Sequence, residues 1–145
     1  MSRTRRYEML IVGAASICLA GVAMAANVRA KADVTCRPAA DKLQYDCVIK
    51  LTNSRTGEPL TGVMLTVGAD MPSMPMMHNV RPVKARPGQE AGVYQARVVL
   101  EMHGDWALQL NMSGAVHDRV IAIMRFEADS AAQISAPDTS ARHKH

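Results

Sequence analysis

Aromatic residues are scarce in this chain, which has one Trp, one Phe and three Tyr among 145 residues. Proteins that bind single-stranded nucleic acid stack bases on aromatic side chains set among basic residues. The formal net charge is +4, and residues 1–25 contribute three Arg and one Glu, which leaves 14 basic against 12 acidic side chains in the remainder. So small and scattered a positive excess, without interleaved aromatics, excludes nucleic acid as a partner.

Catalytic signatures are also lacking. The sequence contains no nucleophile elbow, HExxH, P-loop or dinucleotide fingerprint. A copper oxygenase that binds its metal through the N-terminal amine and a first-residue histidine is excluded too. If residues 1–25 are removed as an export signal, the new N-terminal residue is Ala26, followed by Asn27, and neither is a histidine. We therefore expect a protein that is not an enzyme.

The N-terminal residues have the composition of an export signal. Arg3, Arg5 and Arg6 precede an apolar run over residues 9–26, which closes on the small residues of Ala23-Met24-Ala25. This order predicts a signal peptide over residues 1–25 and a periplasmic protein. The run is also close to the minimum length of a bilayer span, so retention of residues 9–26 as an inner-membrane anchor stays open.

Cysteine is rare as well: Cys18 lies in the predicted leader, and only Cys36 and Cys47 follow it. An even pair in an exported protein most often forms a disulfide. Closing a loop of this size contributes roughly 2–3 kcal/mol. Two metal-binding thiolates are the alternative, but they require a reducing environment, and the export signal argues against one. We expect the disulfide.

Apolar and polar residues alternate with a period of two through most of the chain after residue 26. Successive side chains of a strand point to opposite faces, so this alternation predicts half-buried antiparallel strands. Turns rich in Gly and Pro separate the runs at the spacing of an immunoglobulin-like sandwich. The clearest apolar sets are Tyr45, Cys47, Ile49 and Leu51; Val63, Leu65 and Val67; Tyr94, Ala96, Val98 and Leu100; Trp106, Leu108, Leu110 and Met112; and Val120, Ala122, Met124 and Phe126.

These patterns define one domain. Residues 26–127 are expected to form an all-β, immunoglobulin-like antiparallel β-sandwich of six to seven strands. Residues 128–145 are small, polar and aperiodic, which predicts a disordered tail. The side chains expected to fill the space between the sheets are Tyr94, Val98, Trp106 and Leu108.

The most unusual segment is residues 70–78, with the sequence DMPSMPMMH. Pro72 and Pro75 exclude a core strand or a helix interior and predict a loop, and loops as a rule face solvent. Soft thioether sulfur suits Cu(I), and an imidazole adds a nitrogen donor. We therefore predict a Cu(I) site, for which Ag(I) is an equally soft candidate, formed by Met71, Met74, Met76, Met77 and His78.

Two other roles for these methionines stay open. They would fill irregular gaps if the loop folded back as a lid over the end of the sandwich. Alternatively, they would form a soft patch on which a partner protein docks.

The order of the strands predicts further ligands. An up-and-down succession from Gly62 onward brings the turn at Met102 and His103 to the same end of the sandwich as the methionine loop. The same count puts His117 at the opposite end. Met102 and His103 are therefore added to the predicted metal ligands, with a plain turn as the alternative.

Three short motifs, taken in order, resemble the YtkA-like domain family, which is related to FixH-like proteins. They are the Met-Pro-x-Met stretch of residues 71–77, Gly92-Val93-Tyr94 and Met102-His103-Gly104-Asp105-Trp106, and the likeness covers roughly residues 34–126. The resemblance implies a small exported or membrane-anchored immunoglobulin-like domain. Some members of that family are associated with heavy-metal efflux adaptors or with copper-oxidase assembly.

Together these features predict a periplasmic copper(I)-binding or copper-delivery accessory protein with a membrane or periplasmic protein partner. The alternative is a metal-free immunoglobulin-like interaction module of a membrane efflux or oxidase-assembly complex.

Overall fold

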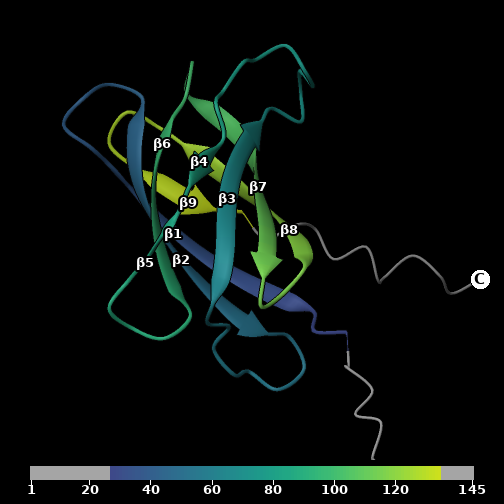
Figure 1. Ribbon diagram of the computed structural model, residues 1–145. Helices are drawn as coiled ribbons and strands as arrows, with labels where there is room; N and C mark the ends of the chain where they lie inside the picture. Colours follow the sequence, from purple (N-terminus) through teal and green to yellow (C-terminus); the bar gives the residue numbers. More distant parts are fainter. Residues whose placement is uncertain (1–26, 135–145) are drawn as a thin grey trace, which may run out of the picture.

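Two antiparallel sheets face each other in the structure (Figure 1). The computed structural model describes residues 27–134, and these residues contain no helix. The first sheet has the order β1-β2-β6-β5, formed by Ala30–Pro38, Gln44–Asn53, Val93–Val99 and Arg86–Pro87. The second has the order β4-β3-β7-β8-β9, formed by Val83–Lys84, Val63–Asp70, Gly104–Gly114, Asp118–Phe126 and Ala131–Gln133. The predicted all-β sandwich is confirmed.

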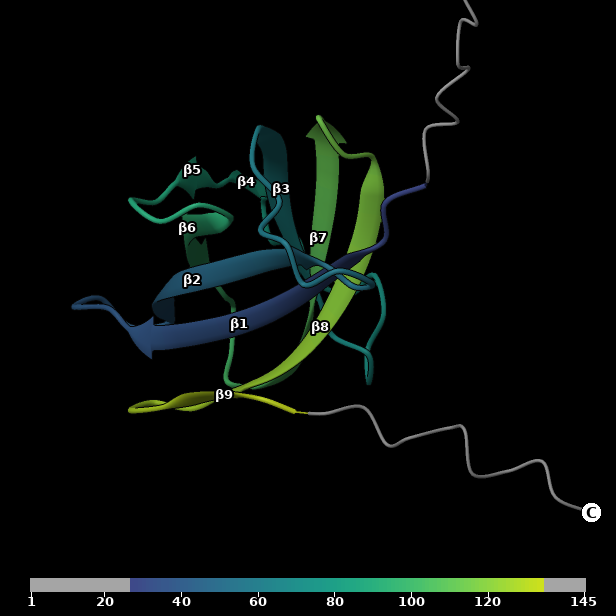
Figure 2. The ribbon, with the colours of Figure 1, turned by 90° about the horizontal axis from the view of Figure 1, so that it is seen from below.

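The inner faces of the two sheets supply the core (Figure 2). Every second residue of β7 is buried, beginning with Trp106 and Leu108, because the pleat turns these side chains toward the facing sheet. Tyr94 and Val98 of β6 face them from the other layer and are buried as well. The four predicted core residues are therefore confirmed. Each such side chain stabilises the fold by about 1.5–3 kcal/mol through burial.

The predicted disulfide joins Cys36 of β1 to Cys47 of β2. The two residues lie directly opposite each other in the antiparallel pair, with their Cα atoms 4.0 Å apart. Both side chains are buried in the core. The bond therefore fastens the first hairpin from inside the sandwich, and this prediction is confirmed.

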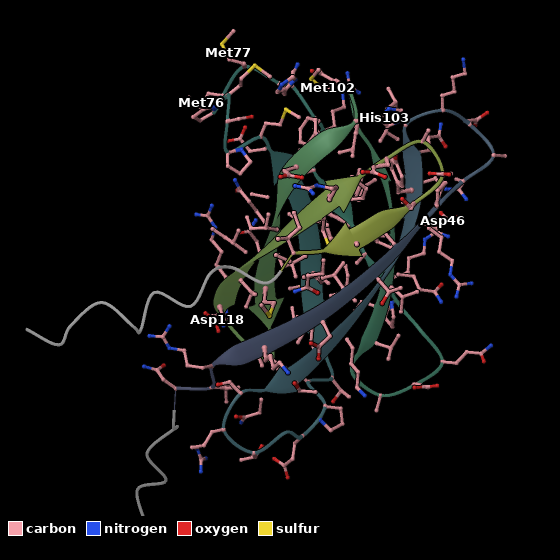
Figure 3. The ribbon with its side chains drawn as sticks, turned by 180° about the vertical axis from the view of Figure 1, so that it is seen from behind. Asp46, Met76, Met77, Met102, His103 and Asp118 are labelled. Carbon is pink, nitrogen blue, oxygen red and sulfur yellow. A yellow bond between two sulfur atoms is a disulfide. The ribbon has the colours of Figure 1, made fainter. Side chains whose placement is uncertain are left out.

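The path of the chain brings two distant segments to one end of the sandwich. β3 and β7 are antiparallel, with Asp70 opposite Ala107 and Val63 opposite Gly114. The loop after β3 and the turn before β7 therefore lie together, and we call residues 71–78 and 101–104 the methionine-rich end. Figure 3 shows Met76, Met77, Met102 and His103 there, with Asp118 at the far end.

His117 lies in the turn between β7 and β8, next to Asp118, at the end of the sandwich remote from the methionines. The strand count thus gave the correct placement of all three histidines of the domain. The count is correct because β4 and β5 act as one returning segment: the chain passes from one sheet to the other at Ala85 without reversing its direction.

The domain extends beyond the expected boundary at residue 127. Ala131–Gln133 form β9, which pairs with Met124–Phe126 of β8. The Gln133 side chain also accepts a hydrogen bond from the backbone N–H of Val34, at 2.9 Å, and so covers the open edge of β1. The prediction of a disordered tail from residue 128 is therefore wrong for residues 131–133. Small residues without a long apolar pattern gave no signal for so short an edge strand.

The predicted signal peptide, residues 1–25, and the alternative anchor, residues 9–26, lie outside the described residues, as does the tail from residue 135. Within residues 27–134, no helix is long and apolar enough to cross a membrane.

Candidate metal centre

The methionine loop is held in a defined shape by Asp70, the last residue of β3. Its Oδ1 atom accepts hydrogen bonds from the backbone N–H groups of Met71, at 2.9 Å, and Met76, at 3.2 Å. Two successive turns follow, closed by Met74 N to Met71 O at 3.0 Å and Met77 N to Met74 O at 3.3 Å. The predicted loop is confirmed, and its backbone carries several internal hydrogen bonds.

Met71 was predicted as a ligand in an exposed loop, but its side chain is buried. It continues the inward alternation of Val63, Leu65 and Val67 past the end of β3. Its methyl carbon packs so closely on Gly104 that a Cβ atom there would lie 2.8 Å from it. Gly104 also has a positive φ of 136°, which favours glycine. Met71 thus ties the loop to the turn before β7.

The remaining methionines of this end form an outer group. Met76 and Met77 have exposed fractions of 90% and 75%, and Met74 and Met102 are each 41% exposed. Met76 has a positive φ of 62°, an uncommon conformation for a residue with a side chain. Exposed apolar side chains on a constrained backbone suggest a binding surface.

His78 follows the loop and folds inward, unlike the outer methionines. Its side chain is 11% exposed, and its Nδ1 atom lies 2.7 Å from Oε2 of Glu101. Oε1 of the same carboxylate accepts a hydrogen bond from the backbone N–H of Asn79, at 3.2 Å. Both bonds, first that from His78 and then that from Asn79, lower the pKa of Glu101 below its ordinary value.

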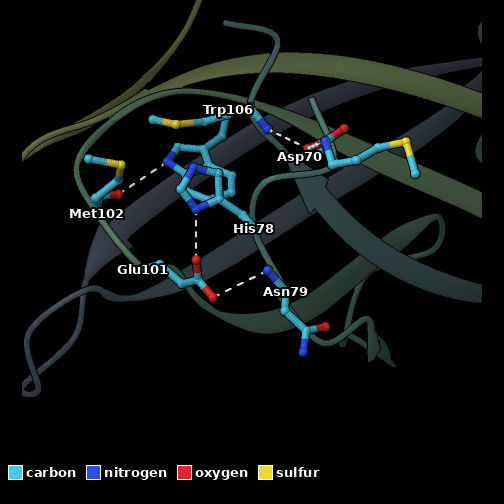
Figure 4. Close-up of polar contacts among 8 residues, drawn as sticks. Asp70, His78, Asn79, Glu101, Met102 and Trp106 are labelled. Carbon is cyan, nitrogen blue, oxygen red and sulfur yellow. Dashed lines mark hydrogen bonds and ion pairs between the residues drawn. The ribbon is translucent and has the colours of Figure 1, made fainter. Parts of the chain in front are cut away.

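The other ring nitrogen of His78 has no hydrogen bond. Nε2 is the one buried side-chain nitrogen or oxygen without a partner among the residues that the structure describes. The His78 ring packs against the indole of Trp106, with 5.0 Å between the ring centroids (Figure 4). Trp106 is itself held by a hydrogen bond of 3.1 Å from Nε1 to the carbonyl of Met102. Trp106 is therefore a core residue, as predicted, and also one wall of this site.

His103 does not join His78. It is exposed and, with Met102, borders a groove lined by residues 38–45, which include the turn between β1 and β2. The antiparallel pairing of β3 and β7, the contact of Met71 with Gly104 and that of His78 with Trp106 thus bring the predicted residues to one end, with His103 on its rim: Met71, Met74, Met76, Met77, His78 and Met102. Glu101 is absent from the predicted site. A carboxylate next to Met102 carries no motif of its own, and only the fold brings it to His78, 23 residues away.

The donors gathered here differ from those of a hard metal site. Within residues 27–134, no three His, Cys, Asp or Glu side chains are grouped so that they could bind a metal ion. The donors that this end presents are thioethers, the imidazole of His78 and, on the rim, that of His103, and thioethers are soft ligands.

The fold and the methionine-rich end together define the class of protein. It is a small antiparallel β-sandwich domain of immunoglobulin-like character that carries methionines in the loops at one end. Within that class the chain belongs to the YtkA-like family, whose model matches residues 27–111. Neither the curated proteins nor the solved structures contain a match to the chain. The predicted family is confirmed.

Proposed function

We propose that this protein is a periplasmic accessory protein that binds Cu(I), or delivers it to a membrane or periplasmic partner, without catalysing a reaction. One observation supports this above all others. Methionines from two segments, the loop after β3 and the turn before β7, gather at one end of the sandwich with His78. Hydrophobic packing accounts for one of them, Met71, whereas the side chains of the others are exposed to solvent.

The chemistry of these donors favours Cu(I). Thioether sulfur is soft and uncharged, and it ligates without losing a proton, so it suits Cu(I) better than Zn(II) or Mg(II). Met74, Met76, Met77 and Met102 provide enough exposed sulfur donors to complete the coordination of one ion. Their exposure gives an incoming or outgoing ion direct access, which a delivery protein needs.

The same exposure supports a second function, a metal-free interaction module. Met76 and Met77 present flexible apolar side chains to solvent, and such side chains adapt to varied protein surfaces. This role uses the bulk of the side chain and not the sulfur atom. The two functions are therefore separable by a change that keeps the bulk and removes the sulfur.

The test replaces Met74, Met76, Met77 and Met102 together with Leu. Leu and Met have similar volumes, so the variant is expected to fold with wild-type stability. Cu(I) binding is measured by competition with a chromogenic chelator under ascorbate. Met64→Leu is the matched control, because Met64 is 64% exposed but lies at the start of β3, far from the loop.

We expect the quadruple variant to lose most of its Cu(I) affinity while Met64→Leu keeps the wild-type value. Wild-type protein that fails to compete with the chelator, or a quadruple variant that competes as well as wild type, would contradict the copper function. Retention of partner binding by the Leu variant would then favour the interaction module.

A further inference from the structure

The two nitrogens of His78 lie in contrasting surroundings. Nδ1 faces a carboxylate oxygen at 2.7 Å, whereas Nε2 is buried without a partner. A buried polar atom without a hydrogen bond destabilises the fold, because it has lost its water and gained no partner. Such atoms are rare in folded proteins and call for an explanation.

Glu101 decides which nitrogen carries the proton. A carboxylate that is ionised only accepts hydrogen bonds, and the N–H of Asn79 occupies its other oxygen. The short contact to His78 therefore requires hydrogen on Nδ1. In the neutral imidazole this leaves the lone pair on Nε2, the tautomer that a metal ligand needs.

The surroundings hold this lone pair in a fixed direction. Trp106 packs against the ring, and its own indole is anchored on the carbonyl of Met102 (Figure 4). Glu101 restrains the ring through Nδ1 of His78. It also restrains the next residue, Asn79, by accepting a hydrogen bond from its backbone N–H. The imidazole is thus restrained by both of its neighbours before any ion arrives.

We propose that Glu101 is a positioning residue for Cu(I), which fixes His78 with the Nε2 lone pair free as the buried nitrogen donor of the methionine-rich end. This inference rests on the proposed copper function. A carboxylate that holds the second nitrogen of a ligating histidine sets its tautomer and orientation and raises its basicity. The unpartnered Nε2 atom then gains its missing partner when the ion binds.

The test compares three substitutions in the full protein. Glu101→Leu removes the acceptor, and Glu101→Gln keeps an acceptor oxygen but removes the charge. Glu90→Leu is the matched control, because Glu90 is an exposed glutamate in the turn between β5 and β6, away from His78. Far-ultraviolet circular dichroism establishes that each variant is folded.

The first readout needs no metal. In 15N-labelled protein, two-bond proton–nitrogen correlations distinguish the Nδ1–H from the Nε2–H tautomer. Wild type and Glu101→Gln are expected to show His78 as the Nδ1–H tautomer, and Glu101→Leu is expected to show both forms. Exposed His103 and His117 serve as internal references.

The second readout is Cu(I) competition with a chromogenic chelator. We expect Glu101→Leu to lower the affinity about 10–100-fold, Glu101→Gln to lower it less, and Glu90→Leu to leave it unchanged. On addition of Cu(I), the nitrogen resonance of His78 that shifts most is expected to be Nε2.

Two results overturn the inference and leave the copper function standing. They are wild-type Cu(I) affinity in Glu101→Leu, and an Nε2–H tautomer of His78 in the wild-type apoprotein. Wild-type protein that binds no Cu(I) overturns both proposals together.

Discussion

The two ends of the sandwich use similar loops in different ways. The end opposite the methionine-rich end comprises residues 53–62 and 115–118, and two side chains, those of Tyr94 and Asn53, pair backbone groups there. The buried hydroxyl of Tyr94 donates to the carbonyl of Leu60 at 2.9 Å and accepts from the N–H of Val63 at 3.2 Å. Oδ1 of Asn53 accepts from the N–H groups of Arg55 and Thr56.

The methionine-rich end shares this design only in part. Asp70 accepts two loop N–H groups much as Asn53 does, but Nε2 of His78 is left unpaired and Met76 and Met77 face solvent. An arrangement optimised only for stability would bury these apolar groups and pair this nitrogen. The difference fits the proposed function, in which the methionine-rich end binds and the opposite end serves the fold.

The largest expected effect concerns Trp106, which belongs both to the core and to the methionine-rich end. Trp106→Ala is expected to lower the free energy of unfolding by about 3–5 kcal/mol and to weaken Cu(I) binding, because the ring that supports His78 is lost. Met112→Ala, near the other end of the same strand, should cost about 2–5 kcal/mol and leave Cu(I) binding unchanged. Urea unfolding and chelator competition measure the two quantities. Equal Cu(I) affinities for both variants would show that Trp106 acts only in the core.

A smaller effect on stability distinguishes two inward-facing polar side chains, those of Tyr94 and His78. Tyr94→Phe leaves a buried carbonyl and a buried N–H unpaired, which should cost about 1–3 kcal/mol. His78→Leu loses one hydrogen bond to an exposed carboxylate but removes the unpartnered Nε2, so its stability should stay within about 1 kcal/mol of wild type. Only the second variant should lose Cu(I) affinity. A large destabilisation by His78→Leu would mean that this histidine is chiefly structural, and the contrast between the ends would fail.

The smallest expected effect compares the two side chains that cap the loops. Asp70→Ala and Asn53→Ala should each cost about 0.5–2 kcal/mol, as the loss of a cap does elsewhere. Amide hydrogen exchange should speed up at Met76 in the first variant and at Thr56 in the second, without cross-effects. Asp70→Ala should also weaken Cu(I) binding by a few fold, because a looser loop loses more conformational entropy on binding. Faster exchange at both ends in either variant would show that the loops are coupled.

Sequence patterns were informative wherever a short-range rule applies. Alternation located the long strands and the buried faces, since a pleated strand turns every second side chain inward. Met71 was predicted as a ligand of the exposed loop, although the same rule, applied one step past β3, gives it the inward position that the structure shows. The cysteine pair and the end occupied by His117 were likewise predictable, from export and from strand order.

Long-range contacts were beyond such rules. No periodicity signals that Glu101 meets His78, since antiparallel pairing and the 71–78 loop together create that contact across 23 residues. β9 was missed for a related reason: three residues carry too little pattern, and their pairing with β8 stabilises them.

The sequence by itself determined the class of fold, the disulfide, the family and the soft donors of one loop, because each follows from local composition, spacing or a short motif. The tertiary structure alone decided which methionines are buried and which are exposed, and which histidine lies beside them. It also decided that one imidazole nitrogen is held by a carboxylate while the other stays free. These properties depend on which surfaces the two sheets bring together, and local sequence does not encode the identity of a neighbour from a distant strand.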